Sequence, residues 1–182
     1  MTTSTTEETA AAPSTATSEP PRATKKARVA KKGKEHERRT PVEGSLLGEI
    51  EIPRIGLSAI ILEGTEPATL RRAVGHISGT ALPGQPGSLC IAGHRDSFFR
   101  PLRRIAAGDD IIVKTATGRV TYRVQSTRIV DPEDVEVLDN TPADAITLVT
   151  CYPFRFIGTA PKRFVVRAGR MPVARLEKTE AR

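Results

Sequence analysis

Short runs of β-branched and apolar residues recur along the chain from about residue 46 onward. Val, Ile and Thr are frequent in these runs, and Gly, Pro or Asp stands at most of their boundaries, which is typical of short strands. The pattern predicts strands at Gly48–Ile55, Ser58–Leu62, Ser88–Ala92, Asp110–Thr115, Arg119–Val130, Ala145–Thr150 and Arg163–Ala168. Their spacing favours a mostly antiparallel barrel or sandwich over a wound βαβ sheet.

Two short helical patterns interrupt the strands. One covers Glu66–Val74, with Pro67 suited to an early helical position and Gly75 suited to the end. The other covers Ser97–Ile105. A turn at Thr117–Gly118 is expected to join two strands as a hairpin. The chain is therefore predicted to fold as a mostly β domain with short helices, over residues 45–172.

The two ends of the chain have a different composition. Nineteen of the first twenty-four residues are Ser, Thr, Ala or Pro, and Lys and Arg dominate residues 25–39. Such sequence has little apolar surface to bury, so residues 1–44 are predicted to be a disordered tail and residues 173–182 a frayed one. The basic run is of a kind that contacts nucleic acid or anionic lipid, but a solvated linker is the favoured interpretation.

Charge and cysteine content narrow the class of protein only slightly. The net charge of +7 does not by itself indicate a nucleic-acid partner, and none is predicted. Two cysteines, Cys90 and Cys151, are too few for a disulfide framework. No apolar run approaches the ~18 residues that predict a membrane span, and the N-terminus lacks the apolar stretch of a secretory signal. No cofactor or metal is predicted.

Candidate chemistry lies at the ends of two apolar strands. Cys151 ends the run Ile146–Cys151, and Pro153 must end regular pairing beyond it because proline has no N–H to donate. A thiol there would be accessible at a rim, although a lone cysteine is equally often a small core residue. His94 follows Ser88–Ala92 in a polar, turn-like run, where an imidazole could act as base or acid towards a thiol.

An arginine is the third candidate. Arg163 opens the last predicted strand, and a permanently charged guanidinium can stabilise the oxyanion formed when an amide carbonyl is attacked. Arg167 shares its strand face four residues later and is the main rival. The alternative is that Arg163 is an exposed strand residue that forms a surface ion pair and takes no part in catalysis.

Together these runs resemble a known family. Thr147–Pro153 (TLVTCYP) resembles the TLxTC signature of sortases, Ala92–Asp96 (AGHRD) resembles their histidine loop, and the strand from Arg163 resembles their arginine strand. Gly75–Gly84 and Phe98–Leu102 are also similar to sortases, closest to class D. The resemblance extends from about Gly48 to Ala168.

The resemblance implies a closed β-barrel with short helices and a groove for a sorting peptide of LPxTG type. It implies that Cys151 is the nucleophile that forms a thioacyl enzyme, that His94 is the acid and base, and that Arg163 holds the oxyanion or the substrate backbone. Thr150 is expected to help to position the substrate, and His76 to have a structural or substrate-contact role. The implied partners are a sorting-signal peptide of a surface protein and an amine acceptor, either a peptidoglycan stem or a pilin lysine.

Two alternatives stay open beside a sortase-like transpeptidase at the membrane or cell envelope. One is a thiol hydrolase that does not transfer the acyl group. Another is a catalytically silent binding module with a basic tail. Cys90, four residues before His94, is interpreted as buried filler, with a redox partner for Cys151 or a Cys90/His94/Cys151 metal site as less favoured readings.

Overall fold

The structure is a computed structural model and describes residues 41–134, 144–155 and 158–172. The predicted tails, residues 1–40 and 173–182, lie outside these ranges. Residues 41–44, which we assigned to the tail, are described: the Gly44 amide donates to the Glu63 carbonyl at 2.8 Å, and Glu43 accepts a hydrogen bond from the Thr69 hydroxyl at 2.9 Å.

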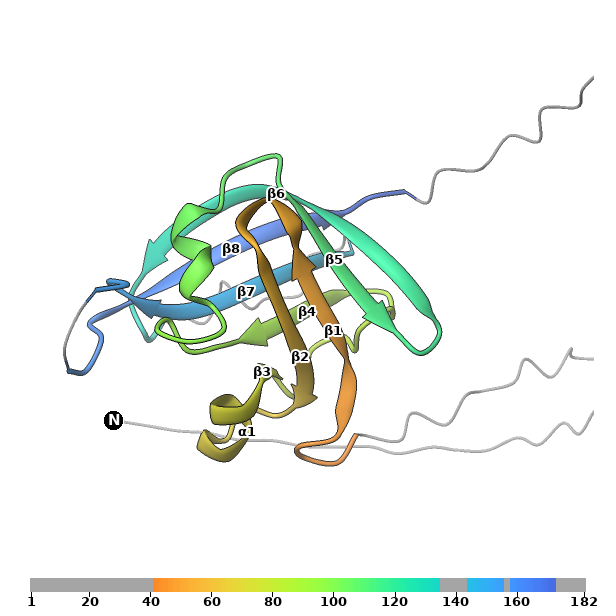
Figure 1. The fold of residues 1–182 in the computed structure, drawn as a ribbon, viewed down its shortest axis with the longest axis horizontal. Coiled ribbons are helices and arrows are strands. Elements are labelled where there is room, and N and C mark those ends of the chain that lie inside the picture. The colour runs from red at the N-terminus through yellow and green to blue at the C-terminus, as the bar shows by residue number, and fades with distance from the viewer. Residues whose placement is uncertain (1–40, 135–143, 156–157, 173–182) are drawn as a thin grey trace, which may run out of the picture. The chain divides into compact units, whose positions relative to one another are not determined.

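Eight strands form a closed barrel in the order β1-β2-β3-β4-β7-β8-β6-β5 (Figure 1). Most neighbouring strands are antiparallel, but β2–β3 and β4–β7 are parallel pairs. The strands are β1 Leu46–Ile52, β2 Leu57–Glu63, β3 Val74–His76, β4 Ser88–Ala92, β5 Asp110–Thr115, β6 Gly118–Val130, β7 Ala145–Tyr152 and β8 Lys162–Arg170. The predicted mostly β barrel with short helices is confirmed.

Helical structure is brief. The α-helix α1 covers Pro67–Arg72, and the 3-10 helices η1 and η2 cover Pro53–Ile55 and Arg100–Arg104. The expected helix at Glu66–Val74 is therefore shorter than predicted, because Val74 already belongs to β3 and pairs with Ile61 of β2. The predicted hairpin is present, with Thr115 of β5 opposite Gly118 of β6.

The barrel interior is filled by aliphatic side chains that alternate with outward-facing ones along each strand. On the strands that matter below, the fully buried core residues are Leu89, Ile91, Ile146, Leu148, Val166 and Ala168. The residues between them must point to the outer surface of the barrel. This alternation decides whether the Cys151 side chain points into the barrel or out of it.

Candidate active site

Three adjacent strands bring the predicted catalytic residues to one end of the barrel. Within β7 and β8, Cys151 lies directly opposite Arg163. On the other side of β7, Ala92 of the parallel strand β4 lies opposite Val149. His94 and Cys151 are each two residues beyond that pair, so they lie at the same level, with His94 in the turn after β4 and Cys151 still within β7.

Strand parity places Cys151 and Arg163 on the outer face. Leu148 and Val166 point into the core, so Cys151 and Arg163, each three residues from one of them, point outward. Both side chains are partly exposed, as is His94. The nucleophile is therefore accessible from solvent and is not a core thiol.

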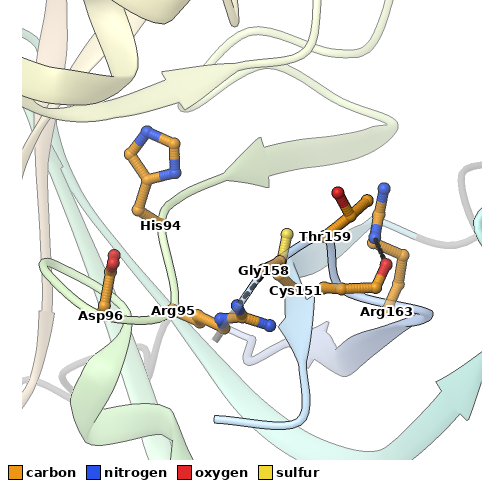
Figure 2. Close-up of a pocket in the computed structure, with 8 residues that line it drawn as sticks. His94, Arg95, Asp96, Cys151, Gly158, Thr159 and Arg163 are labelled. Atoms are coloured by element: carbon orange, nitrogen blue, oxygen red, sulfur yellow. Dashed lines mark hydrogen bonds between the residues drawn. The ribbon is translucent and has the colours of Figure 1, made fainter. Parts of the chain in front are cut away.

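A pocket of about 290 Å³ contains all three residues. It lies between the segment after β4 and the connection that joins β7 to β8 (Figure 2). Its lining residues are His94, Arg95, Asp96, Cys151, Gly158, Thr159, Ala160 and Arg163. The chain thus joins a thiol, an imidazole and guanidinium groups in one cleft, which is the set of groups that acyl transfer through a thioester needs.

The turn that carries His94 is attached to β7 through Gly93. The Gly93 amide donates to the Val149 carbonyl at 3.2 Å, and the buried Thr150 hydroxyl donates to the Gly93 carbonyl at 2.7 Å. The Phe99 amide closes the turn by donating to the His94 carbonyl at 3.1 Å. A Cβ atom at Gly93 would lie only 2.7 Å from the buried Phe99 ring, so glycine is required for this packing.

The structure separates the two predicted substrate-contact residues from the pocket wall. Thr150 is 3% exposed and contacts the histidine turn, so its hydroxyl acts on the position of His94. His76 is 1% exposed and its Nδ1 lies 2.6 Å from the Glu63 carboxyl, with Thr80 at 2.9 Å from Nε2. These contacts favour the structural role for His76 over the substrate-contact role.

Arg163 and its rival Arg167 are four residues apart on β8. Arg163 lines the pocket, and its Nη1 donates to the carbonyls of Ala160 and Lys162 at 3.3 and 3.1 Å. Arg167 lies opposite Thr147 and is not among the residues that line the described pocket. The placement supports Arg163 as the oxyanion residue.

Cys90 is fully buried and is paired with Thr147, which is four residues before Cys151 on β7. Four strand residues span about 13 Å, whereas a disulfide needs Cα atoms within about 7 Å. The register therefore excludes a disulfide with Cys151, and the described residues hold no group of three or more His, Cys, Asp or Glu side chains that could bind a metal ion. Burial raises the pKa of the Cys90 thiol, which makes it less reactive as well.

Two features of the site were not predicted from sequence. Tyr152, Phe154 and Phe164 form an aromatic cluster near the ends of β7 and β8, with centroid separations of 5.2 to 6.4 Å. Tyr152 and Phe164 are stacked, and Phe154 meets both rings edge to face. Arg95 binds across the pocket to the β7–β8 connection. Arg95 was part of the histidine run, but the identity of its partners depends on contacts between residues 58 or more positions apart.

Comparison with known proteins identifies the family. Residues 50–171 match the family model described as the sortase domain. The chain belongs to the sortase family. Sortases are cysteine transpeptidases, so the enzyme class is that of a thiol acyl-transferring enzyme.

Individual sortases support this assignment. Sortase D of Bacillus subtilis is 34% identical over 132 residues, which cover 72% of this chain and 67% of that protein. Sortase A of Listeria monocytogenes is 31% identical over 141 residues, which cover 75% of this chain and 59% of that protein. The chain thus spans about three fifths to two thirds of the length of these relatives.

Solved structures agree with the fold. A sortase D5 transpeptidase from Clostridium perfringens superimposes with a TM-score of 0.66 at 29% identity, covering 72% of this chain and 82% of that chain. Sortase A from Corynebacterium diphtheriae gives a TM-score of 0.66 at 33% identity, covering 72% and 63%. The sortase family acts at the cell envelope. Within the described ranges, none of the helices is long and apolar enough to cross a membrane.

Proposed function

We propose that this sortase cleaves an LPxTG-like sorting signal and transfers the new acyl end to an amine. The observation that supports this proposal most directly is the direct pairing of Cys151 with Arg163, in one outward-facing pocket with His94. The nucleophile and the cation lie on the neighbouring strands β7 and β8, and the proton carrier lies in the turn after β4, which also neighbours β7.

In the first half of the reaction, the Cys151 thiolate, whose proton is held by His94, attacks the carbonyl carbon of the Thr residue in the signal. The C–N bond breaks, and His94 gives a proton to the leaving amine, so the acyl group remains as a thioester on Cys151. A guanidinium has five N–H donors. Of the Arg163 nitrogens, only Nη1 has hydrogen-bond partners among the described residues, so the other N–H groups of this side chain can donate to the oxyanion.

In the second half, an acceptor amine attacks the thioester. His94 takes the proton of this amine, a new amide bond forms, the C–S bond breaks and the thiolate of Cys151 is restored. We propose a peptidoglycan stem peptide or a pilin lysine as the acceptor, at the membrane or cell envelope. Thr150 contributes by holding the carbonyl of Gly93 and thus the histidine turn.

The test is to trap the thioester. Incubation with a panel of LPxTG-like peptides should add the acyl fragment to Cys151 by mass spectrometry, and hydroxylamine should release it. Cys151→Ala should remove the adduct, whereas Cys90→Ala should retain it, since Cys90 is buried away from the pocket. Cleavage that persists in Cys151→Ala without any adduct would refute the proposal.

Transfer is distinguished from hydrolysis in the same assay. Adding an amine acceptor should convert the acid product into an amide product and speed the loss of the adduct. A wild-type enzyme that yields only the acid at every amine concentration would be a thiol hydrolase, in contradiction to the transfer step.

A further inference from the structure

Arg95 forms a two-point bridge across the candidate active site. Its Nη1 donates to the Pro153 carbonyl at 3.1 Å and its Nη2 donates to the Gly158 carbonyl at 3.1 Å. The side chain starts from the histidine turn and reaches the β7–β8 connection, as the dashed line to Gly158 in Figure 2 shows. It therefore connects the base of the proposed reaction to the chain that follows the nucleophile.

The two carbonyls have different positions in that connection. Pro153 is two residues after Cys151 and fixes the end of β7. Gly158 begins the pocket wall formed by Gly158, Thr159 and Ala160. The other end of this wall is held by Arg163, whose Nη1 donates to the Ala160 carbonyl at 3.3 Å. The wall is thus held between two arginines from opposite sides of the pocket.

Arginine suits this contact better than any other side chain. Its planar guanidinium presents donors in a rigid fork, so it can bind two separate carbonyls at once and in a fixed relative position. A lysine ammonium is a point charge on a flexible stem and has no such fixed geometry. Gly93 attaches the histidine turn to β7 through its hydrogen bonds with Val149 and Thr150. Arg95 attaches the same turn to the pocket wall through its hydrogen bond to Gly158.

We propose that Arg95 is a positioning residue of the transpeptidation reaction, which keeps the wall Gly158–Ala160 and the end of β7 in register with the histidine turn. The inference rests on the proposed function. Proton transfer by His94 and attack by Cys151 must both reach the same scissile amide. A displacement of about 1 Å at a reacting group can cost about 10²-fold in rate, so loss of the bridge should lower kcat by about 10- to 100-fold.

The test compares Arg95→Ala and Arg95→Lys with wild type in the full chain. Arg100→Ala is the matched control, because Arg100 is exposed and its side chain makes no hydrogen bond or ion pair with the described residues. The measurements are kcat and KM for peptide cleavage, the rate of Cys151 alkylation by iodoacetamide, and the melting temperature.

We expect kcat to fall 10- to 100-fold in both Arg95 variants and less than 2-fold in Arg100→Ala. Alkylation should change less than 2-fold, because the hydrogen bonds of Arg95 to the Pro153 and Gly158 carbonyls hold the surrounding chain and not the sulfur itself. Because Arg95→Lys retains the charge, this variant separates fork geometry from electrostatics. It also keeps the test valid if Arg95→Ala unfolds.

Three results would overturn the inference: full activity in Arg95→Lys, unchanged kcat in Arg95→Ala, or alkylation that slows in parallel with kcat. The first would assign the effect to charge, and the third would place Arg95 in activation of the thiol. Failure of the proposed function is a separate outcome, because wild type would then form no thioester at all.

Discussion

Replacing His76 by leucine tests whether the pair between His76 and Glu63 is a structural element of the barrel. The two side chains are 1% and 3% exposed, and Nδ1 lies 2.6 Å from the Glu63 carboxyl. Removing one partner of a buried hydrogen-bonded pair leaves the other polar group buried without it, which costs about 1–3 kcal/mol. His76→Leu also removes the contact of Nε2 with Thr80, whereas the Ser78 hydroxyl still donates to Glu63 at 2.7 Å, so we expect a loss of about 2 kcal/mol.

A loss of this size is readily measured by urea unfolding, because domains of this kind are stable by only about 5–15 kcal/mol. The matched control is Lys114→Met, which removes an ion pair with Glu51 whose side chains are 40% and 28% exposed. Exposed pairs contribute about 0.2–1 kcal/mol, so the control should lose no more than about 1 kcal/mol.

The double variant Glu63→Met/His76→Leu sharpens the test. When both side chains are replaced by apolar groups of similar size, neither member of the pair is left buried without the other, so the double variant should be more stable than the sum of the two single losses predicts. Additive losses, or a loss in His76→Leu no larger than in the Lys114 control, would refute the reasoning. A large fall in kcat/KM at unchanged stability would restore the substrate-contact role of His76.

Three further outcomes are expected. Arg163→Lys should lower kcat/KM by at least about 10-fold and Arg167→Lys by far less, because only the first lines the pocket and an oxyanion donor is typically worth ~10²–10³-fold; the reverse ranking would make Arg167 the oxyanion residue. A thiol reagent should modify one cysteine, Cys151, in native protein and two after denaturation, since Cys90 is buried and its thiol pKa is raised; early labelling of Cys90 would contradict the register. The hydrogen bond from the Arg54 side chain lowers the pKa of Asp109 below its ordinary 3.8. The stability that this carboxylate contributes is therefore present at neutral pH and is lost as pH falls through its folded-state pKa. Asp109→Asn should therefore be destabilising in urea unfolding at pH 7, and this deficit should shrink as pH falls below 3.8 and through the folded-state pKa; an equal deficit at neutral and acid pH would argue against this linkage.

Strand positions could be predicted because they depend on local pattern. Ser88–Ala92 and Asp110–Thr115 were predicted with the bounds that the structure has, since β-branched runs between turn residues favour extended backbone wherever they lie. The motifs around Cys151 and His94 could be recognised for the same reason. Each is a short continuous run whose residue types carry the chemistry.

Prediction failed where distant contacts override local preference. Residues 74–76 were assigned to a helix end and a turn, yet they form β3 because β2 and β4 supply hydrogen-bond partners on both sides. His76 lies within this pairing, and its Nδ1 contacts Glu63 of β2, which is distant in sequence. Its distance from the pocket could not be read from the neighbouring Gly-rich sequence.

The sequence by itself determined which residue types could do the chemistry and that they stand at strand ends. Only the tertiary structure decided that Cys151 and Arg163 are direct neighbours, that Cys90 is out of reach of Cys151, and that Arg95 bridges the pocket. The physical reason is that a strand's local pattern specifies its extended backbone and the face that is buried, whereas its neighbours and register are set by closure of the whole barrel.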